Sequence, residues 1–358
     1  MVRLRQPLPD GPLDLVGDVH GEIDALRRLV HHLGGDLDAG RVARPLVFVG
    51  DLIDRGPDSV AVLEAYGRLA ERGLAYCVLG NHELNLLRAE QKEGNGWFFG
   101  HDDRFSEKVP GGVRRLPFSA RSASPDDRVR VLETLRTLPL LLERPDLRVA
   151  HAAWEVDAVA ALPDEGEVVP LLETFGEAVE RALEAEGVTA RAREERARWH
   201  DLKRLDVHPP DDLPHVADED ERIQMSNPIR RITSGPERKV ASGARRYAGG
   251  KWRYVERAPW WLDHHDEVPV VVGHYWRSRA PQGPHEERGW AAESPLHWNG
   301  ARGNVFCVDF SVGRRYFERR QGEPSSYVHG LAALRWPERT LVFDDAPSPE
   351  PTKGFDEP

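Results

Sequence analysis

The chain has few cysteines, no long apolar run and no excess of basic residues. Among its 358 residues only Cys77 and Cys307 are cysteines, and both lie in apolar segments typical of strands. Two buried thiols exclude a disulfide framework and fit a reducing cytoplasm. No stretch reaches the roughly 18 apolar residues of a membrane span, and residues 1–13 lack the apolar core of a signal peptide. We therefore expect a cytoplasmic protein without membrane partners.

Acidic residues outnumber basic ones, 60 against 49, giving a net charge of −11. Such a balance disfavours general nucleic-acid binding, so we expect no stable nucleic-acid partner. The segment Arg222 to Arg257 is nevertheless basic, and an acidic segment, Asp206 to Glu221, precedes it. The basic residues either border a site and attract an anionic substrate or form a solvated face balanced by these acids. The residues concerned are Arg230, Arg231, Arg238 and Lys239.

Three short motifs, GDVHG, GDLIDRG and GNHE, carry most of the chemical information. They place Asp18, His20, Asp51 and Asn81 directly after the apolar segments LDLV, PLVFV and AYCVL. Glycine at the start of each motif lets the backbone turn sharply as it leaves a strand. The side chains of the three motifs should therefore meet at one rim.

The first two motifs each lead into a helical pattern. Apolar residues recur at helical spacing from Glu22 to Leu33, and again from Val60 to Leu69 behind Pro57. Strands that alternate with helices favour an α/β fold with one sheet under packed helices. In such sheets ligands bind beyond the carboxyl ends of the strands.

The motif residues are suited to two neighbouring divalent ions. Such ions need a shared ligand together with oxygen and imidazole donors. Asp18 and His20 can face one ion, Asp51 can bridge, and Asn81 can offer an oxygen to the second. The alternative for any one motif is ordinary turn chemistry, but three motifs in order favour the metal site.

Two later histidines complete this set. His151 ends the apolar run LRVA, and His274 ends VPVVVG, so both follow a strand as the earlier motifs do. A histidine in that position often caps a strand, but an incomplete metal site favours ligation. We expect both imidazoles to bind the second ion.

These motifs resemble the phosphoprotein phosphatase family of calcineurin-like metallophosphoesterases, in its bacterial branch of protein phosphatases and symmetrical diadenosine tetraphosphatases. The resemblance covers the first hundred residues and returns at VAHAAW, VVGHYW, NVFCVDFSVG and GLAALRWPERTLV. It implies an α/β metallophosphoesterase fold with a β-sandwich core flanked by helices and a helical and loop insertion. The implied metal ligands are Asp18, His20, Asp51, Asn81, His151 and His274, with Asp51 shared.

The same resemblance implies roles for the remaining motif residues. His82 would be the general acid for the leaving oxygen, Asp54 would orient it, and Arg55 would clamp phosphoryl oxygens. The Asp54 and Arg55 pair could alternatively be a simple salt bridge near a turn. The predicted phosphate-binding residues are Arg55, Asn81, Arg230 and Arg231.

Two further positions belong to the resemblance. Asp309 matches an acidic position in the closing strand that supports the site. Ala152 and Ala153 follow His151 where the family more often has glycine, so the sequence leaves the local backbone open there.

The implied reaction is hydrolysis of a phosphoester by a metal-bridging hydroxide. The cofactors would be two divalent ions, with manganese expected first and iron or zinc as alternatives. The sequence favours a protein Ser/Thr phosphatase acting on a phosphorylated protein. The alternative is a symmetrical dinucleoside tetraphosphate hydrolase that converts diadenosine tetraphosphate to ADP, with Trp276 stacking on a nucleobase or simply packing. Outside these classes stand a nuclease and a non-catalytic phosphate-binding protein.

We predict a single metallophosphoesterase domain over residues 1–345. Insertions are expected at about 94–127, as a loop or lid, and at 155–265, where apolar spacing in 166–205 predicts helices. The proline-rich, charged end at 346–358 predicts a flexible tail.

Overall fold

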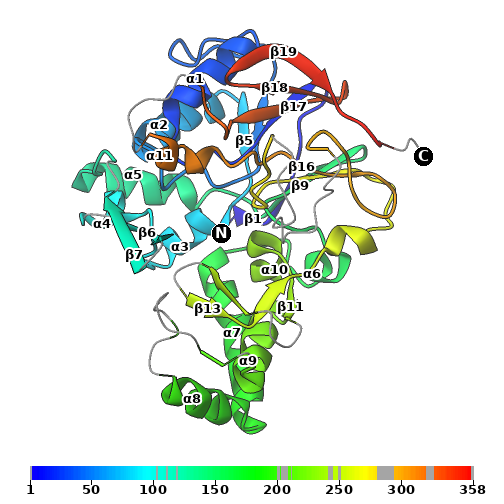
Figure 1. Ribbon diagram of the computed structural model, residues 1–358. Coiled ribbons are helices and arrows are strands. Elements are labelled where there is room, and N and C mark those ends of the chain that lie inside the picture. Colours follow the sequence, from blue (N-terminus) through cyan, green and yellow to red (C-terminus); the bar gives the residue numbers. More distant parts are fainter. Residues whose placement is uncertain are drawn as a thin grey trace.

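Two β-sheets form the centre of the computed structural model (Figure 1). The structure describes residues 2–101, 104–109, 112–117, 120–199, 202, 209–210, 212–240, 245–248, 251–279, 294–319 and 326–355. In the six-stranded sheet β3, β4 and β5 are parallel neighbours, and β17, β18 and β19 extend it in antiparallel fashion. Its strand order is β19 (Ala346–Pro351), β18 (Thr340–Phe343), β17 (Ala332–Trp336), β3 (Leu13–Val16), β4 (Leu46–Phe48) and β5 (Ala75–Cys77).

The second sheet has five strands, in which β9, β15 and β16 run parallel to one another. Its remaining strands extend it on the β9 side, with β8 antiparallel to β9 and β2 parallel to β8. Its strand order is β16 (Val305–Cys307), β15 (Val270–Val272), β9 (Leu147–Ala150), β8 (Leu141–Arg144) and β2 (Arg5–Pro7).

One apolar core lies between the two sheets. Leu15 and Val47 from the six-stranded sheet share a buried cluster with Val149, Val271 and Phe306 from the five-stranded sheet. Because side chains alternate along a strand, the neighbours of Leu15 and Val47 face the other way. The sandwich core that the sequence predicts is therefore confirmed.

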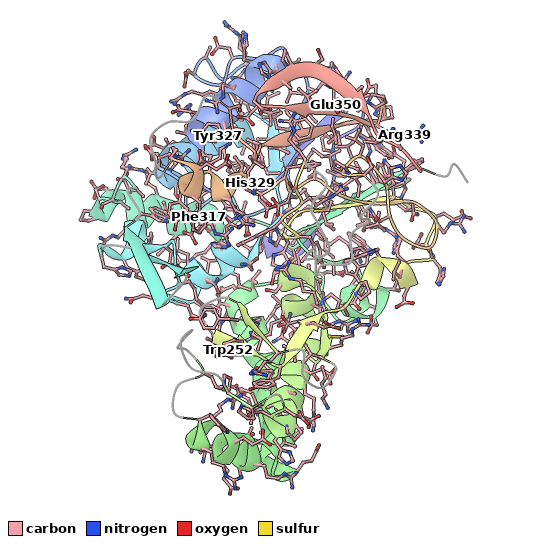
Figure 2. All side chains as sticks on the ribbon, in the orientation of Figure 1. Trp252, Phe317, Tyr327, His329, Arg339 and Glu350 are labelled. Atoms are coloured by element: carbon pink, nitrogen blue, oxygen red, sulfur yellow. The ribbon has the colours of Figure 1, made fainter. Side chains whose placement is uncertain are left out.

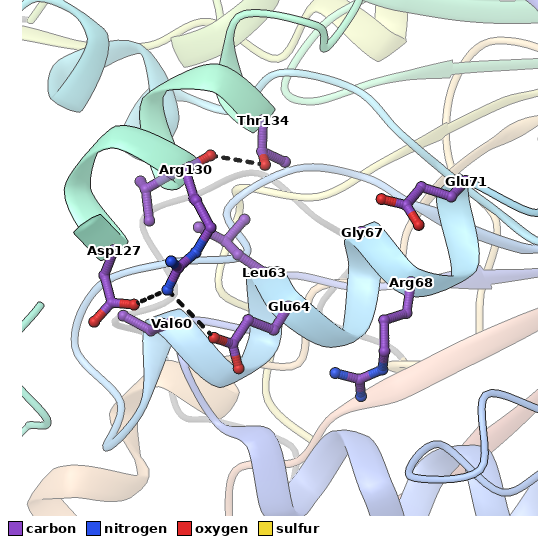
Figure 3. Close-up of a pocket in the computed structure, with 10 residues that line it drawn as sticks. Val60, Leu63, Glu64, Gly67, Arg68, Glu71, Asp127, Arg130 and Thr134 are labelled. Carbon is purple, nitrogen blue, oxygen red and sulfur yellow. Dashed lines mark hydrogen bonds and ion pairs between the residues drawn. The ribbon is translucent and has the colours of Figure 1, made fainter. Parts of the chain in front are cut away.

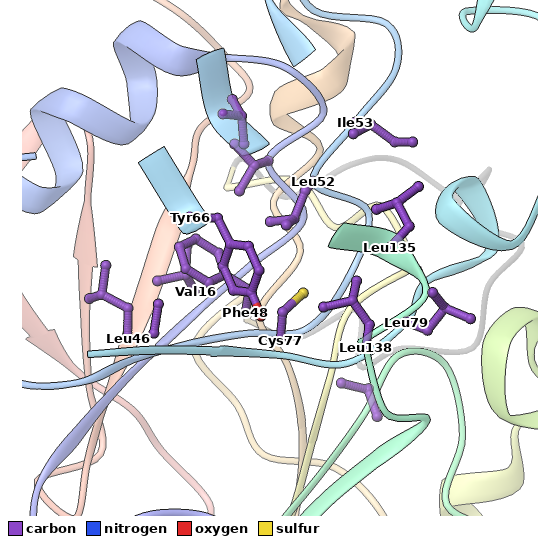
Figure 4. Packing of buried hydrophobic residues seen from close by; sticks show 14 of the residues in the cluster. Val16, Leu46, Phe48, Leu52, Ile53, Tyr66, Cys77, Leu79, Leu135 and Leu138 are labelled. Atoms are coloured by element: carbon purple, nitrogen blue, oxygen red, sulfur yellow. The ribbon is translucent and has the colours of Figure 1, made fainter. Parts of the chain in front are cut away.

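A second core lies on the helix side of the six-stranded sheet. Phe48 and Cys77 from the strands pack there with Tyr66 and Leu135 from the helices (Figure 4). Both cysteines are free and buried, as the sequence predicts. The helices that flank the sandwich are α1 (Ile23–His32), α2 (Ser59–Ala70), α3 (Asn81–Leu87), α5 (Pro125–Leu135), α6 (Val156–Ala160), α10 (Pro228–Ser234) and α11 (Arg315–Glu318), with the short 3₁₀ turns η1 (Trp260–Asp263) and η2 (Val312–Arg314).

Residues 168–257 include an extension at the bottom of Figure 1. It lies inside the predicted insertion at 155–265, and the helices predicted from apolar spacing in 166–205 are confirmed. A small separate core holds it together, where Ala192 and Val216 pack with Tyr254. The elements are α7 (Val168–Ala185), α8 (Val188–Arg198), α9 (Pro214–Met225), β11 (Glu237–Lys239), β12 (Arg246–Ala248), β13 (Lys251–Arg253) and β14 (Val255–Arg257).

The segment 94–127 is more regular than the predicted loop. It contains a short helix and an antiparallel strand pair, and its last residues begin α5. One end is held to the domain, because the Trp97 side chain is buried. Further short elements are α4 (Gly96–Phe99), β6 (Arg104–Val109), β7 (Gly112–Pro117), β1 (Val2–Arg3) and β10 (Glu165–Gly166).

The predicted flexible tail at 346–358 is wrong for the residues that the structure describes. Ala346–Pro351 forms the edge strand β19, and Phe355 packs on Trp298 with ring centroids 4.7 Å apart. Prolines are tolerated on an edge strand when the missing N–H faces away from its neighbour. Pro347 and Pro349 lie in an irregular stretch of the pairing, between the partners Phe343–Ala346 and Leu341–Glu350, whereas Pro351 lies opposite Thr340 at the end of the strand. Residues 356–358 lie outside the described part.

None of the described helices combines the length and apolar character needed to cross a membrane.

Candidate metal centre

The predicted site residues meet at the carboxyl ends of strands from both sheets. Asp18 and His20 follow β3, Asp51 follows β4, and Asn81 and His82 begin α3 behind β5. From the other sheet come the two later histidines, His151 after β9 and His274 after β15. Apart from Asn81, which is partly exposed, these side chains are buried.

Left-handed backbone is concentrated in these turns. Asp51 has φ 49° and Asp54 has φ 74°, in a region that residues other than glycine seldom adopt. His20, Arg55 and His274 share this conformation, with φ between 48° and 70°. Such strain persists only where the surrounding structure fixes it, and it is typical of functional sites.

Asp51 stands at the middle of the cluster. Its Oδ2 lies 3.8 Å from His20 Nε2, 3.9 Å from His82 Nε2 and 3.4 Å from His151 Nε2. The two longer separations exceed hydrogen-bond length. They suit two ligands that each lie about 2.1 Å from a shared ion. Asp51 is thus placed to serve both halves of the site.

The orientation of two imidazoles suits a bound cation. His20 Nδ1 contacts the Ile53 carbonyl at 3.0 Å, and His151 Nδ1 contacts the Val49 carbonyl at 2.7 Å. A carbonyl only accepts, so each Nδ1 donates, and in the neutral imidazole Nε2 is then the unprotonated nitrogen that faces the site. His151 Nε2 then lies 3.2 Å from Asn81 Oδ1, which also presents a lone pair. A cation between the two groups would satisfy both.

Burial and neighbouring charges set the protonation of the ligands. Burial and then the Arg55 guanidinium hold the pKa of His20 well below its usual value, which keeps that imidazole neutral. Burial alone would raise the pKa of Asp51, but the imidazoles of His151 and His82 bring it well below the ordinary value. Neutral imidazole and charged carboxylate are the forms that bind metal.

Asp18 sits where the two sheets meet. Its carboxylate accepts the His274 backbone N–H at 3.1 Å, and it lies 3.9 Å from His20 Nε2. Burial first, and then the carboxylates of Asp309 and Asp51, raise the pKa of Asp18 well above its usual value. An unneutralised carboxylate cluster of this kind favours a bound cation.

Asp309 holds the loops around this cluster. It accepts backbone N–H groups from Trp276 at 2.7 Å and Ser311 at 2.7 Å. Asp309 therefore fixes two turns beside the ligands, which agrees with the supporting position predicted for it. The alanines after His151 are also held, because the N–H groups of Ala152 and Ala153 both donate to the Ile232 carbonyl.

His82 is held by a buried relay. Asp54 Oδ2 lies 2.6 Å from His82 Nδ1, and Trp97 Nε1 donates to Asp54 Oδ1 at 2.8 Å. His82 Nε2 faces Arg55 at 2.9 Å, and Arg55 also reaches His20 Nε2 at 2.8 Å. Arg55 and Asp54 therefore do not form the simple salt bridge that was the alternative.

The basic insertion is largely neutralised. Arg231 contacts Glu155 at 2.7 Å and Asp157 at 2.8 Å, and Lys239 contacts Asp218 at 2.6 Å. Arg238 likewise pairs with Glu256 at 2.9 Å. For these three residues the structure favours the balanced face over the anion site.

Arg230 forms no ion pair with any residue that the structure describes. Burial and then Arg88 lower its pKa. It lies near Arg88 and Glu90, at the end of α3. Arg230 does not belong to the groups of possible metal ligands around Asp51. Its predicted phosphate contact stays a prediction.

The sequence did not point to three residues that lie near the centre, namely Glu83, Trp97 and Arg257. Arg257, the last residue of β14, approaches His274 Nε2 at 2.7 Å. Glu83 accepts the backbone N–H groups of Asp51 and Leu52 at 2.9 and 2.8 Å, which fixes the turn behind β4. Burial and Asp51 raise the pKa of Glu83 to about 7. Glu83 belongs to the GNHE motif, so the sequence could have revealed it, whereas no local sequence pattern points to Arg257 or Trp97.

Trp276 lies next to Arg55, at the metal centre. The Arg55 Cζ stands 4.4 Å from the centroid of the Trp276 ring. Trp260 and Trp261 are buried.

A separate surface pocket of about 240 Å³ lies between α2 and α5 (Figure 3). Arg130 crosses it toward Asp127 and Glu64. None of the predicted site residues lines this pocket, so it plays no part in the metal centre.

Comparison with known proteins agrees with this geometry. Residues 11–175 match the family model of the calcineurin-like phosphoesterases. This segment is similar to a calcineurin-like phosphoesterase domain. This domain carries Asp18, His20, Asp51, Asn81 and His151, and its family implies divalent metal ions, whereas His274 comes from outside the matched range.

Curated relatives of this phosphoesterase domain are named tetraphosphatases. An asymmetrical bis(5'-nucleosyl)-tetraphosphatase, PrpE of Bacillus velezensis, is 33% identical over 156 residues, covering 41% of this chain and 58% of that protein. A symmetrical bis(5'-nucleosyl)-tetraphosphatase of a Janthinobacterium species is 31% identical over 157 residues, covering 42% and 49%. The matched part therefore spans about half of each relative.

The solved structure of a cold-active protein-tyrosine phosphatase from a psychrophilic Shewanella species is also similar to this chain. It is 15% identical with a TM-score of 0.45, covering 98% of this chain and 82% of that one.

Proposed function

We propose that this protein is a two-metal phosphoesterase that hydrolyses a dinucleoside tetraphosphate. The observation that carries the proposal is the meeting of imidazole and carboxylate ligands around Asp51, with Arg55 in the same cluster. His151 Nε2 lies 3.2 Å from Asn81 Oδ1, so a neutral imidazole and the amide oxygen would both offer lone pairs to a cation there. The first ion would be held by Asp18, His20 and Asp51, and the second by Asp51, Asn81, His151 and His274.

Divalent ions in this site would supply positive charge to the phosphoryl oxygens and an activated water. Arg55 offers a planar, permanently charged fork to the same oxygens, since its nitrogens already reach the rim through His20 and His82. His82 would give a proton to the leaving oxygen from Nε2. Asp54 orients this imidazole through Nδ1, and Trp97 holds Asp54 in turn.

The names of the relatives support the nucleotide substrate over the phosphoprotein that the sequence first favoured. A tetraphosphate chain carries several anionic groups in a row, whereas a phosphoserine carries one. A chain of charges suits a site in which more than one arginine approaches the metal ligands, as Arg55 and Arg257 do here.

The test is product release by the manganese-loaded protein, with diadenosine tetraphosphate, a phosphopeptide and an aryl phosphate supplied at equal concentration. We expect fastest turnover of the tetraphosphate and complete loss of activity after exhaustive chelation, restored by manganese. Faster phosphate release from the peptide would replace the nucleotide substrate by a phosphoprotein. Absence of turnover on all three would overturn the phosphoesterase proposal.

A further inference from the structure

Arg314 is a cation beside the metal centre that the mechanism above does not use. It ends the η2 turn, directly after Gly313. A Cβ added to Gly313 would lie 2.6 Å from His20 Cδ2, so the backbone of this turn rests against the imidazole of a metal ligand. Arg314 therefore starts from the rim of the site.

Arg314 and Arg55 approach the same aromatic ring. The Arg314 Cζ lies 6.0 Å from the centroid of Trp276, and the Arg55 Cζ lies 4.4 Å from it. Asp309 accepts the Trp276 backbone N–H, and Trp276 has φ 49°, so the main chain that carries the ring is held in place. Trp276 thereby links two guanidinium groups on one side of the metal ligands.

The neighbours of Arg314 are paired, whereas Arg314 is not paired with any carboxylate that the structure describes. Arg315 forms a buried ion pair with Asp344, and Arg319 pairs with Glu22. Glu318, the nearest acid along the turn, is engaged by the His329 ring at 2.7 Å and by the Val328 backbone N–H. Figure 2 shows His329 beside the helix that follows Arg314.

Partial burial without an ion pair to any described carboxylate makes Arg314 receptive to an anion. Burial lowers the pKa of this guanidinium, which means that its charge is less well solvated than on an open surface. A desolvated arginine gains most from a charged partner that meets its planar fork. Phosphate oxygens supply that geometry.

We propose that Arg314 is a specificity-determining residue that binds a second phosphoryl group, next to the one that Arg55 clamps. The inference rests on the proposed phosphoesterase function and names the substrate class as phosphoanhydride chains. A monoester has only one phosphoryl group, so it cannot engage both guanidinium groups in this way. The Arg314 side chain would therefore distinguish phosphoanhydride chains from phosphomonoesters.

The experiment compares Arg314→Gln with the wild-type, manganese-loaded protein on diadenosine tetraphosphate and on an aryl phosphate. We expect the KM for the tetraphosphate to rise about tenfold, because one charge-assisted contact of about 1.4 kcal/mol is lost. The KM for the aryl phosphate should rise about twofold at most. Arg314→Lys should recover part of the lost affinity because it restores the charge without the fork.

Inhibition by products gives a second measurement that does not depend on turnover of the tetraphosphate. With the aryl phosphate as reporter, Arg314→Gln should weaken inhibition by ADP about tenfold and inhibition by orthophosphate much less. Arg302→Gln, which removes an exposed arginine from a 3.5 Å contact with Glu267, is the matched control and should change neither.

Equal changes for both substrates, or no change for either, would overturn the role of Arg314 while leaving the phosphoesterase intact. A wild-type protein without any turnover would instead overturn the proposed function itself. A folding defect would be seen as a lower melting temperature of Arg314→Gln, and the kinetic comparison would then rest on Arg314→Lys.

Discussion

At the residue scale, the site depends on side chains that are fixed by buried polar contacts. Asp54 is the clearest case, because its two carboxylate oxygens are taken by His82 Nδ1 and Trp97 Nε1. Its left-handed φ of 74° costs about 1–3 kcal/mol, so the surrounding contacts must hold it. The position of His82 is therefore set by residues that never touch substrate.

His82→Ala tests the assignment of the general acid. We expect kcat to fall by about 10²–10⁴, since proton transfer to the leaving oxygen is lost. Bound manganese, measured by plasma mass spectrometry, should stay near two ions per chain. Because His82 also belongs to the His20 and Asp51 cluster, loss of one ion would make it a ligand instead, as we expect for His151→Ala.

Trp97→Phe tests the relay behind His82. The buried Asp54 oxygen loses its donor, and an unsatisfied buried acceptor costs about 1–3 kcal/mol. We expect kcat to fall about tenfold with unchanged metal content, because the imidazole is less well oriented. Trp298→Phe is the control, since it removes a similar bond, from Nε1 to Thr352 Oγ1 at 2.9 Å, and the Trp298 ring packs on Phe306 and Phe355 instead of on a predicted ligand. A matching loss of kcat in both variants would contradict a positioning role.

At the element scale, local patterns predicted the helices and strands that build the site. The spacing of apolar residues was sufficient to predict α1 and α2, because each helix presents one buried face. The same reasoning misread β19, where three prolines suggested disorder. Pairing with β18, which no local pattern encodes, makes this segment a strand.

Phe355→Ala tests whether the end of the chain stabilises the fold. Phe355 packs on Trp298 and Trp336, with Arg339 4.3 Å above its ring. Removing this apolar contact should lower the free energy of unfolding by about 2 kcal/mol, measured by urea denaturation. Ser348→Ala on the exposed side of β19 should change it little. Equal stability of both variants would mean that the contact contributes nothing.

At the scale of the whole molecule, the ligands come from both sheets. Asp18, Asp51 and Asn81 follow strands of the six-stranded sheet, whereas His151 and His274 follow strands of the five-stranded sheet. Bound ions would therefore join the two layers. The ligands could be predicted because each lies in a short local sequence pattern. Arg257 and Arg314 come close to the site only when the chain is folded.

Metal removal should therefore lower thermal stability as well as activity. A free ion concentration of 100 times the dissociation constant stabilises the folded chain by about 2.7 kcal/mol per site. We expect the melting temperature to fall by roughly 5 °C after chelation, measured by calorimetry. Asp51→Asn should make the melting temperature less sensitive to manganese. Equal sensitivity in the variant would contradict the shared ligand.

The prolines of β19 also determine how copies of the protein meet one another. Pro347, Pro349 and Pro351 have no backbone N–H and lie on the edge strand of the six-stranded sheet. The outer rim of this sheet therefore lacks amide donors at these three positions. A strand from another chain cannot complete a ladder there, so this rim resists edge-to-edge aggregation at high protein concentration.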